Sequence, residues 1–324
     1  MNFSKIMFLT IMFFSTMLVM SSSNWISMWM GMEMNLMSFI PFIYKKKEKK
    51  TAQAMMIYFL VQSMGSMIIL FSILMNKMIH INFMSITSYL IIIGIMLKLG
   101  AAPFHNWFPE VVSNLGWIEN LILMTWQKIA PMILLSNFIN KDILLINIIL
   151  SSMVGAIGGL NTTSLRKIMA YSSINHMSWM FLMMLMQTQW VLYLLIYTLM
   201  LITTFIYFQD KKMFYLNQVN SKTESILEKY MISSIMLSMG GLPPFLGFLP
   251  KWMVINSMIN SNMMMLMLFM LAMSLLTLFY YMRIMSSFML IYSSIQSWNY
   301  KKNKMMTIMF VNFMLPTFLI LSFW

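Results

Sequence analysis

The sequence predicts an all-α, polytopic membrane protein, a bundle of about eleven transmembrane helices. Of its 324 residues, 60% are hydrophobic and only 9% are charged, and the mean hydropathy is +0.78. A soluble domain normally has about 25% charged residues. Apolar runs close to 20 residues long recur along the chain, the length that crosses a hydrocarbon core of about 30 Å. We therefore expect one integral membrane domain over residues 1–324 and no soluble domain.

Polar and charged residues divide the apolar runs into eleven predicted spans. The first run, from Ile6 to Met20 after Lys5, also fits a secretory signal peptide, but the many spans behind it favour a retained helix. The spans cover roughly 4 to 22, 25 to 43, 53 to 75, 82 to 102, 118 to 138, 143 to 160, 166 to 186, 190 to 208, 230 to 258, 262 to 290 and 305 to 323.

The basic residues favour this count of spans. Eleven spans place 14 of the 21 basic residues in loops on one face, where Lys5 joins them, and only Lys77 and Lys141 on the other face. The positive-inside rule then puts the N-terminus on the cytoplasm-like side and Trp324 on the opposite side. The 14 residues are Lys45, Lys46, Lys47, Lys49, Lys50, Arg166, Lys167, Lys211, Lys212, Lys222, Lys229, Lys301, Lys302 and Lys304.

The composition also excludes several classes of site. The net charge of +13 is typical of nucleic-acid-binding proteins, but the lysines lie in short loops between apolar runs, so we expect no nucleic-acid partner. The chain has no Cys, which excludes disulfides, iron–sulfur clusters and thiolate metal sites. No nucleotide-binding glycine motif and no histidine pair at ligand spacing is present. We therefore expect no redox centre, cofactor or metal in this chain.

The amino-acid usage indicates the kind of gene that encodes the chain. The chain has 47 Met, and its lysines and arginines divide 19 to 2. Such usage resembles that of animal mitochondrial genes, which are AT-rich and read an additional codon as Met. The composition therefore agrees with an organellar membrane protein.

A motif with the spacing G-x-x-P-F-x4-P occurs twice. It begins at Gly100 in span four and at Gly241 in span nine, an offset of 141 residues. Five spans separate the copies, so the second copy is expected upside down in the bilayer. We therefore expect two five-helix inverted repeats, about 4–138 and 143–290, followed by an extra helix at 305–323. Inverted repeats with an interrupted helix in each half are a recurrent plan of transporters.

The prolines of both copies predict two broken helices. Proline lacks an N–H and clashes with the preceding turn of a helix. A break frees backbone carbonyls, which in a membrane only water or polar partners can satisfy. A proline kink accommodated by packing is an alternative for each helix, because such kinks are common in membrane helices.

One acidic residue, Glu33, lies near the middle of the span at 25 to 43. A carboxylate at the centre of a membrane helix costs at least about 2.5 to 3.5 kcal/mol on insertion scales. It therefore needs a partner, a proton or a function. We expect a function, because intramembrane carboxylates mark ion and proton pathways.

Three lysines also lie inside apolar runs. Lys98 is close to the predicted break of span four, and Lys251 directly follows a proline of the second break. Lys128 is about eleven residues from either end of its run, too far to extend its ammonium to the interface. Burial lowers the pKa of a lysine and a nearby carboxylate raises it. A lysine opposite Glu33 would therefore switch between charged and neutral, which is the chemistry of a proton relay.

A histidine, His176, lies one helical turn after Ser172 and on the same face of span seven. A lone histidine among Ser and Asn is either a packed, hydrogen-bonded residue or a proton carrier. The sequence leaves both interpretations open.

The remaining ionisable residues predict structural or interfacial positions. His80 and His105 lie near span ends, and we expect them to be solvated or structural. Arg283 is within two turns of the basic face and is expected to extend to it. Glu110 and Glu119 flank a loop, and we interpret both as interfacial.

Several of these stretches resemble one known family. They closely resemble, in order and along nearly the whole chain, the NADH-ubiquinone oxidoreductase chain 2 family of animal, particularly insect, mitochondria. The stretches are Met32-Glu33-Met34-Asn35-Leu36, Lys98 to His105, Thr125 to Pro131, Gly158 to Lys167, Tyr171 to His176 and Gly240 to Lys251.

The resemblance implies an antiporter-like subunit in the membrane arm of respiratory complex I, in the mitochondrial inner membrane. It implies that FMN, iron–sulfur clusters, NADH and ubiquinone belong to other subunits, and that the partners are other membrane-arm subunits and lipids such as cardiolipin. It also implies basic loops in the matrix and a C-terminus in the intermembrane space. With eight acidic residues, the chain does not resemble chain 1 with its acid-rich loops, so we expect no quinone site.

The resemblance also implies a role for each buried ionisable residue. Glu33 and Lys98 would form the charged pair of one half, and Lys128 would be the central relay lysine. His176 would belong to a hydrophilic axis that leads to Lys251 on the second broken helix. Quinone reduction elsewhere in the complex would alter the pair and move a proton along this order of residues.

Two alternatives stay open. The first alternative is a freestanding cation/proton antiporter, a transport protein without a redox partner. The second is a structural subunit whose charges only dock helices. That last interpretation predicts that Lys98 and Lys251 pair directly with acids of neighbouring helices in a dry interior.

Overall fold

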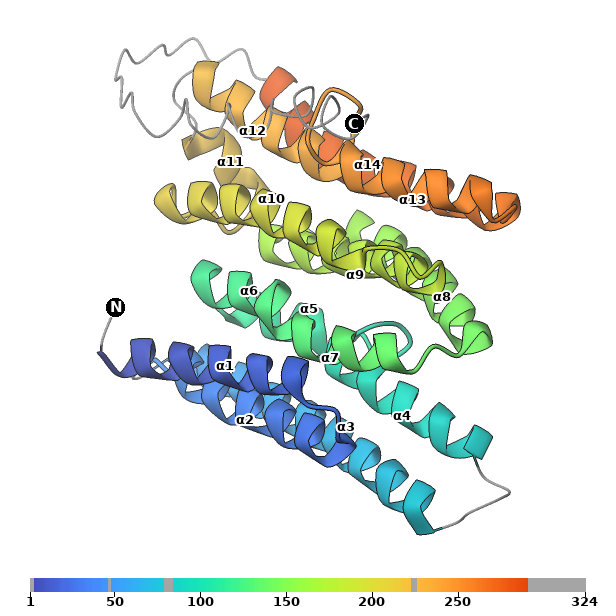
Figure 1. Cartoon of the computed structure of the whole chain (residues 1–324). Coiled ribbons are helices and arrows are strands. Elements are labelled where there is room, and N and C mark those ends of the chain that lie inside the picture. Colours follow the sequence, from blue (N-terminus) through green and yellow to red (C-terminus); the bar gives the residue numbers. More distant parts are fainter. Residues whose placement is uncertain (1–2, 46–47, 79–83, 223–225, 291–324) are drawn as a thin grey trace. The chain divides into compact units, whose positions relative to one another are not determined.

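The computed structural model describes residues 3–45, 48–78, 84–222 and 226–290, and these fold into helices (Figure 1). One isolated β-bridge, between Ser164 and Tyr215, is the only extended pairing in this part of the chain. The helices are α1 (Phe3–Ser21), α2 (Trp25–Ile43), α3 (Lys49–Met78), α4 (Met84–Leu99), α5 (Trp107–Asn114), α6 (Trp117–Met124), α7 (Trp126–Asn137), α8 (Lys141–Leu160), α9 (Leu165–Leu185), α10 (Trp190–Asp210), α11 (Leu216–Lys222), α12 (Ile226–Gly240), α13 (Phe248–Asn260) and α14 (Met264–Leu290).

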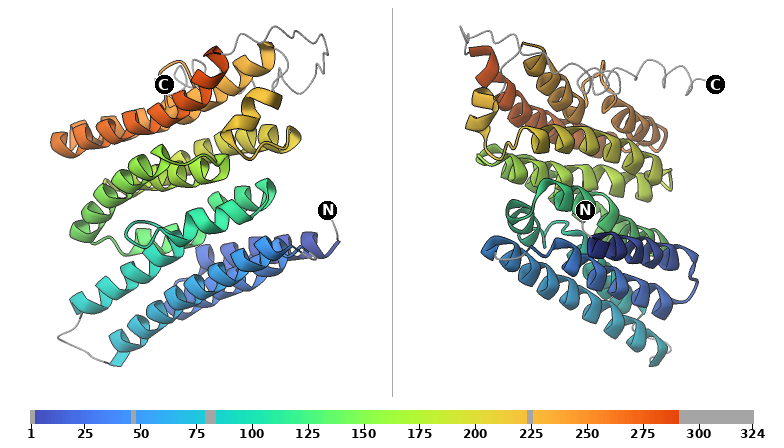
Figure 2. Two further views of the ribbon diagram at one scale, coloured as in Figure 1. Left: turned by 180° about the vertical axis from the view of Figure 1, so that it is seen from behind. Right: turned by 90° about the vertical axis from the view of Figure 1, so that its left-hand side faces the viewer.

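The chain divides into two compact units, Met1–Asn147 and Ile148–Trp324. In the first unit, α2 packs against α1 and α3, and α3 packs against α4 (Figure 2). Glycines allow close approach: a Cβ on Gly65 of α3 would lie 3.1 Å from the Gly94 carbonyl of α4, and one on Gly94 would lie 3.0 Å from the Gly65 carbonyl. Small residues at helix contacts are typical of membrane bundles, where close packing replaces the hydrophobic effect.

In the second unit, α9 is the central helix. It contacts α10, α13 and α14, and almost all of its side chains are buried, including the polar Ser173, Asn175 and His176. A helix that is buried on all sides needs partners for each polar group it carries. The polar residues of α9 are therefore candidates for a functional site.

The bundle is of the membrane type. Five helices of the described part, namely α1, α3, α8, α10 and α14, are long and apolar enough to cross a bilayer. Their outer faces carry large apolar side chains such as Phe14, Met67 and Phe279, which are 72%, 66% and 63% exposed. Exposed apolar surface of this extent marks contact with lipid or with other proteins.

Two predicted spans differ from the observed helices. Span five, predicted as one helix at 118 to 138, is two helices, because α6 ends at Met124 and α7 begins at Trp126. The predicted break in span four lies at its end, after Leu99, and the chain continues as the separate helix α5. Span nine is broken as predicted, between Gly240 and Phe248. The predicted span at 305 to 323 lies outside the described residues.

The basic loops meet within each unit. In the first unit, Lys5 and Lys45 both form ion pairs with Glu119, at 3.7 and 3.2 Å, so the start of α1 and the end of α2 lie together. In the second unit, the loop before α9 and the loop after α10 are joined by two backbone hydrogen bonds, from Leu165 to Phe214 and from Leu216 to Thr163. Basic segments that are distant in sequence therefore lie next to one another within each unit.

Candidate functional site

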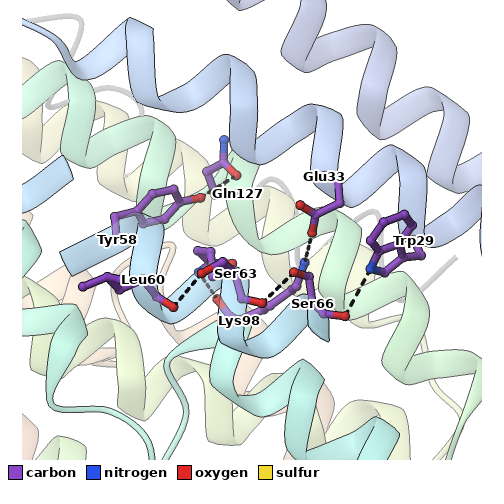
Figure 3. Close-up of polar contacts among 9 residues, drawn as sticks. Trp29, Glu33, Tyr58, Leu60, Ser63, Ser66, Lys98 and Gln127 are labelled. Carbon is purple, nitrogen blue, oxygen red and sulfur yellow. Dashed lines mark hydrogen bonds and ion pairs between the residues drawn. The ribbon is translucent and has the colours of Figure 1, made fainter. Parts of the chain in front are cut away.

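The first unit contains the predicted charged pair. Lys98 Nζ donates to Glu33 Oε1 at 3.4 Å, linking α4 to α2 (Figure 3). The Lys98 side chain is only 2% exposed, whereas that of Glu33 is 23% exposed. The pair is therefore buried at its cationic end and reaches the surface of this chain at its acidic end.

Neighbouring helices shape the pocket for Lys98. A Cβ on Gly65 would lie 3.0 Å from Lys98 Cγ, so the glycine leaves room for the lysine stem beside α3. On the same helix, the Ser66 carbonyl accepts a hydrogen bond from the Trp29 indole of α2 at 3.1 Å (Figure 3). This bond holds α2 and α3 together one turn from Glu33.

A small cavity connects Lys98 with Lys128. Both lysines line it, together with Asn35, Tyr58, Gln62 and Gln127 and several apolar side chains. It leaves about 20 Å³ for the centres of water molecules. One water needs roughly 10 to 15 Å³ on this measure and two to four polar partners. The cavity is therefore large enough and polar enough for water between the two lysines.

Lys128 lies in the first turn of α7, directly after the break at Thr125. Its side chain is 3% exposed, and its Nζ lies 5.4 Å from the centre of the Phe108 ring. Three residues further on, Pro131 has no N–H to donate, so the Gln127 carbonyl loses its usual helical partner. Lys128 thus lies close to a break in the helix and to a backbone carbonyl without its usual helical partner.

The cavity wall contains polar residues that the sequence did not single out. Gln127 donates to Asn35 Oδ1 at 3.1 Å and accepts a hydrogen bond from the Tyr58 hydroxyl at 3.3 Å. Figure 3 shows Tyr58 and Gln127 side by side near the Glu33–Lys98 pair. These amide and phenol groups orient one another and supply partners for water between the lysines.

The two copies of the repeated motif share one backbone conformation. Gly100 and Gly241 end α4 and α12 with positive φ of +67° and +75°, which an L side chain rarely adopts. Both glycines make the same hydrogen bond: the Gly100 N–H donates to the Leu97 carbonyl, and the Gly241 N–H donates to the Ser238 carbonyl. The two bonds are offset by the same 141 residues. The next helices, α5 and α13, begin at Trp107 and Phe248, again with this offset.

Lys251 lies at the second break, in the first turn of α13 rather than in the middle of a span. Its Nζ donates to the Gly240 carbonyl at 2.7 Å and lies 5.8 Å from the centre of the Trp179 ring of α9. The Gly240 carbonyl belongs to the C-terminal end of α12, where the helix dipole favours a cation. Among the described residues Lys251 forms no ion pair with an acid, contrary to the helix-docking interpretation.

His176 is buried in the second unit, 3% exposed, near the centre of α9. Its Nδ1 is 2.9 Å from the Tyr193 hydroxyl of α10, a partner that the sequence analysis missed. Trp179, one turn further along α9, is the residue that contacts Lys251. The second unit thus brings His176 and Lys251 to the same segment of α9, and the first unit brings together Glu33, Lys98 and Lys128.

Two other predicted positions have specific partners. Glu119 is 6% exposed and pairs with Lys5 and Lys45. The Arg283 guanidinium donates to the carbonyls of Leu160 and Thr162, at the end of α8 and in the loop that leads to Arg166. A guanidinium at a helix C-terminus supplies donors for carbonyls that have no helical partner.

The histidine and acidic residues near span ends follow the expectation in part. His105 is half-buried, and its Nδ1 lies 3.2 Å from the Pro103 carbonyl in the first break, which fits a structural role. Glu110 is exposed. His80 lies outside the described residues.

Comparisons with known proteins agree with this architecture. Residues 22–277 match a family model described as NADH:quinone oxidoreductase/Mrp antiporter, TM. The chain is also similar to solved structures: it superposes with a TM-score of 0.82 on a chain of respiratory complex I from Thermus thermophilus with bound aureothin, at 20% identity, covering 96% of this chain and 75% of that chain. At this identity the likeness shows the fold.

Curated relatives extend the match to nearly the full length. NADH-ubiquinone oxidoreductase chain 2 of Anopheles gambiae is 44% identical over 308 residues, which cover 93% of this chain and 90% of the relative. The chain 2 protein of Locusta migratoria is 41% identical over 324 residues, covering 98% and 95%. The chain belongs to the NADH-ubiquinone oxidoreductase chain 2 family.

Proposed function

We propose that this chain translocates protons as a membrane-arm subunit of NADH:ubiquinone oxidoreductase, through the residues Glu33, Lys98, Lys128, His176 and Lys251. The observation that carries the proposal is the water-sized cavity lined by both Lys98 and Lys128, with Lys98 paired to Glu33. A lysine buried inside a membrane protein is costly, and such residues mark ion or proton pathways.

The first half of the relay works by electrostatics. Two unit charges about 4 Å apart interact by about 4 kcal/mol at an effective dielectric of 20, which corresponds to roughly three pKa units. Glu33 and Lys98 are 3.4 Å apart, so weakening their contact changes the charge that Lys128 experiences across the cavity. Lys128 then binds or releases a proton as Lys98 changes state.

Partner subunits act on the acidic end of this pair. Glu33 is 23% exposed on its side chain, in a helix whose neighbours Met34 and Met37 are exposed at 48% and 59%. An exposed apolar face with a carboxylate in it is costly against lipid. We infer that another membrane-arm subunit covers this face of α2 and biases the pair during quinone reduction.

The second half of the relay is His176 and Lys251. The contact with the Tyr193 hydroxyl orients the His176 ring, and the hydrogen bond to the Gly240 carbonyl orients the Lys251 ammonium. Each contact therefore sets the direction in which its residue can transfer a proton. The Lys251 ammonium lies at the C-terminal end of α12 and is well placed to hold a proton, since the carbonyl end of that helix is electronegative.

The membrane arrangement completes the proposal. Eleven spans, two inverted five-helix repeats at about 4–138 and 143–290, and an extra helix at 305–323 form one antiporter-like domain in the mitochondrial inner membrane. The basic loops face the matrix and the C-terminus faces the intermembrane space. The matched backbone of the two breaks supports a repeat, and the clustering of basic loops within each unit supports the orientation.

Redox groups belong to other subunits in this proposal. FMN, iron–sulfur clusters, NADH and ubiquinone act elsewhere in the complex, and lipids such as cardiolipin contact the basic loops. The lack of Cys supports this division, because iron–sulfur clusters are held by thiolates.

The test is Lys128→Met in the assembled complex, with proton uptake and NADH oxidation measured together in liposomes. We expect proton uptake to fall by at least about 100-fold, the scale of losing a proton-transferring side chain. NADH oxidation should fall with it because the two are coupled. The matched control is Lys141→Met, which removes an exposed lysine at the start of α8.

Two outcomes would contradict the proposal. Unchanged rates of proton uptake and NADH oxidation in Lys128→Met would remove the relay role. The family model also covers Mrp antiporters, so a sodium-dependent proton flux by the chain in liposomes without its redox partners would instead identify a freestanding antiporter.

A further inference from the structure

His176 lies at one end of a group of buried tyrosines, of which the relay above uses only Tyr193. Tyr193 and Tyr197 of α10 are both 0% exposed, as is Tyr280 of α14, and Tyr281 is 1% exposed. We call these four residues the tyrosine cluster. Four phenols at full burial in one unit are unusual, because Tyr normally keeps its hydroxyl at a polar boundary.

The tyrosine cluster begins at the histidine itself. Tyr193 places its hydroxyl 2.9 Å from His176 Nδ1, and the Tyr197 ring lies over the imidazole with centroids 4.7 Å apart. The hydroxyl and Nδ1 are therefore in range for direct proton transfer, which needs about 2.6 to 3.2 Å between heavy atoms.

The tyrosine cluster continues to α14. Tyr281 lies near both Tyr193 and Tyr197 and beside Ser172, one turn before His176 on α9. Tyr280 and Tyr281 are in edge contact at 4.8 Å. Gly159 of α8 makes room for this end, because a Cβ there would lie 2.6 Å from the Tyr280 ring.

Two hydroxyls of the tyrosine cluster lack a hydrogen bond of good geometry. Within the described part of the chain, the buried hydroxyls of Tyr280 and Tyr281 interact with each other, and that of Tyr281 also interacts with Ser172, but neither has its full set of partners. Leaving such a group unsatisfied is costly, and a phenyl ring would fill the same space without that cost. Native proteins meet this cost when water supplies the missing hydrogen bonds. The hydroxyls of Tyr280 and Tyr281 therefore retain capacity for hydrogen bonds to water beside α9.

We propose that Tyr193 positions His176 and exchanges protons with it, and that the tyrosine cluster is a hydrated branch of the relay leading from His176 toward the end of α8. This inference rests on the proposed function. In each transfer the Tyr193 oxygen accepts a proton from His176 while its own hydroxyl proton passes to water, so the phenol keeps no net charge. Return of a proton by the same groups restores His176.

The test compares Tyr193→Phe with Tyr207→Phe in the assembled complex. Each change removes one buried hydroxyl from α10, but Tyr207 lies four turns beyond Tyr193 and outside the tyrosine cluster. Proton uptake and NADH oxidation are measured per assembled complex in liposomes. We expect Tyr193→Phe to slow both by about fivefold, the scale of one hydrogen bond, and Tyr207→Phe to change them less than about twofold.

A double-mutant cycle separates relay from packing. If Tyr193 acts through His176, the double variant His176→Gln/Tyr193→Phe is no slower than His176→Gln alone, whereas independent packing defects add. Tyr281→Phe supplies a second arm that keeps the His176 hydrogen bond intact, and we expect it to slow proton uptake about twofold.

The outcomes distinguish this inference from the proposed function. If Lys128→Met abolishes proton uptake while Tyr193→Phe matches Tyr207→Phe, the tyrosine branch is wrong and the relay stands. Additive effects in the double variant would also overturn the branch. If Lys128→Met leaves proton uptake unchanged, the proposed function itself fails.

Discussion

The two breaks of this molecule have the same backbone but opposite chemistry. Both follow a glycine in the left-handed conformation, and both release the last carbonyls of a helix. At the first break, the neutral amide of Gln62 donates to the Lys98 carbonyl at 3.0 Å. At the second, the donor is a cation, because Lys251 donates to the Gly240 carbonyl, one position later in the repeat.

The difference follows from where each lysine enters. Lys98 precedes the first break, so its ammonium is free to reach sideways to the carboxylate of Glu33 on α2. Lys251 follows the second break, so its side chain folds back over Gly241 onto the end of α12. The repeated backbone therefore provides similar positions for a lysine in both units. Whether the lysine precedes or follows the break determines which group its ammonium contacts.

The largest expected effect compares removal of the two lysines. Lys98→Met leaves Glu33 without its cation, and breaking a buried pair costs about 3 to 5 kcal/mol, less here because the Glu33 side chain is 23% exposed. Lys251→Met leaves no acid behind, only the Gly240 carbonyl, at about 1 to 3 kcal/mol. The midpoint temperature of thermal inactivation of the complex measures both losses.

Neutralising Glu33 sharpens this contrast. Glu33→Gln should restore much of the stability lost in Lys98→Met and none of that lost in Lys251→Met, because only the first lysine balances a carboxylate. Equal rescue of both variants would show that the two lysines share one acidic partner and that the contrast is false.

A smaller effect is expected from the glycines. Gly241→Ala forces an L side chain to a φ of +75°, which costs about 1 to 2 kcal/mol, and sets a methyl 2.8 to 2.9 Å from Lys251 Cδ, Cε and Nζ. We expect proton uptake to fall by roughly tenfold as the ammonium leaves the Gly240 carbonyl. Gly100→Ala carries a similar backbone cost, but its methyl meets Phe108 and Trp107 and no lysine atom.

Gly240→Ala is the matched control. A Cβ at Gly240 would meet its nearest neighbour at 3.5 Å, an ordinary contact, and the residue does not need a positive φ. Proton uptake and assembly should therefore stay close to those of the unaltered complex. Loss of proton uptake in this control would show that the region is sensitive to any change. The effect of Gly241→Ala could then not be assigned to the Lys251 ammonium.

The sequence predicted the long helices well and the polar contacts poorly. Apolar runs bounded by charged residues located α2, α8 and α10 to within about two residues, and the repeated prolines located the break before α13. The break at Thr125 escaped prediction because no proline or glycine marks it. There the Thr125 hydroxyl bonds the Leu121 carbonyl at 2.7 Å, a local bond that competes with helical geometry.

The sequence predicted the charged residues of the candidate site but not its neutral polar residues. A charge in an apolar run is conspicuous, so Glu33, Lys98 and Lys128 were found from their positions alone. Gln62 and Tyr193 were not, because Gln and Tyr are tolerated in membrane helices and their partners are set by packing. Gln62 acts on a carbonyl 36 residues away, and sequence spacing does not encode such a contact.

The smallest expected effect tests the neutral partner of the first break. Gln62→Leu removes the donor to the Lys98 carbonyl and should lower the stability of the complex by about 1 to 3 kcal/mol, the cost of one buried acceptor without a partner. Gln53→Leu, on the exposed face of the same helix, is the control and should change stability by less than about 0.5 kcal/mol. If Gln62→Lys recovered the stability lost in Gln62→Leu, a cation would serve the first break as it serves the second. We expect no such recovery, because a second ammonium beside Lys98 would repel it and weaken its pair with Glu33.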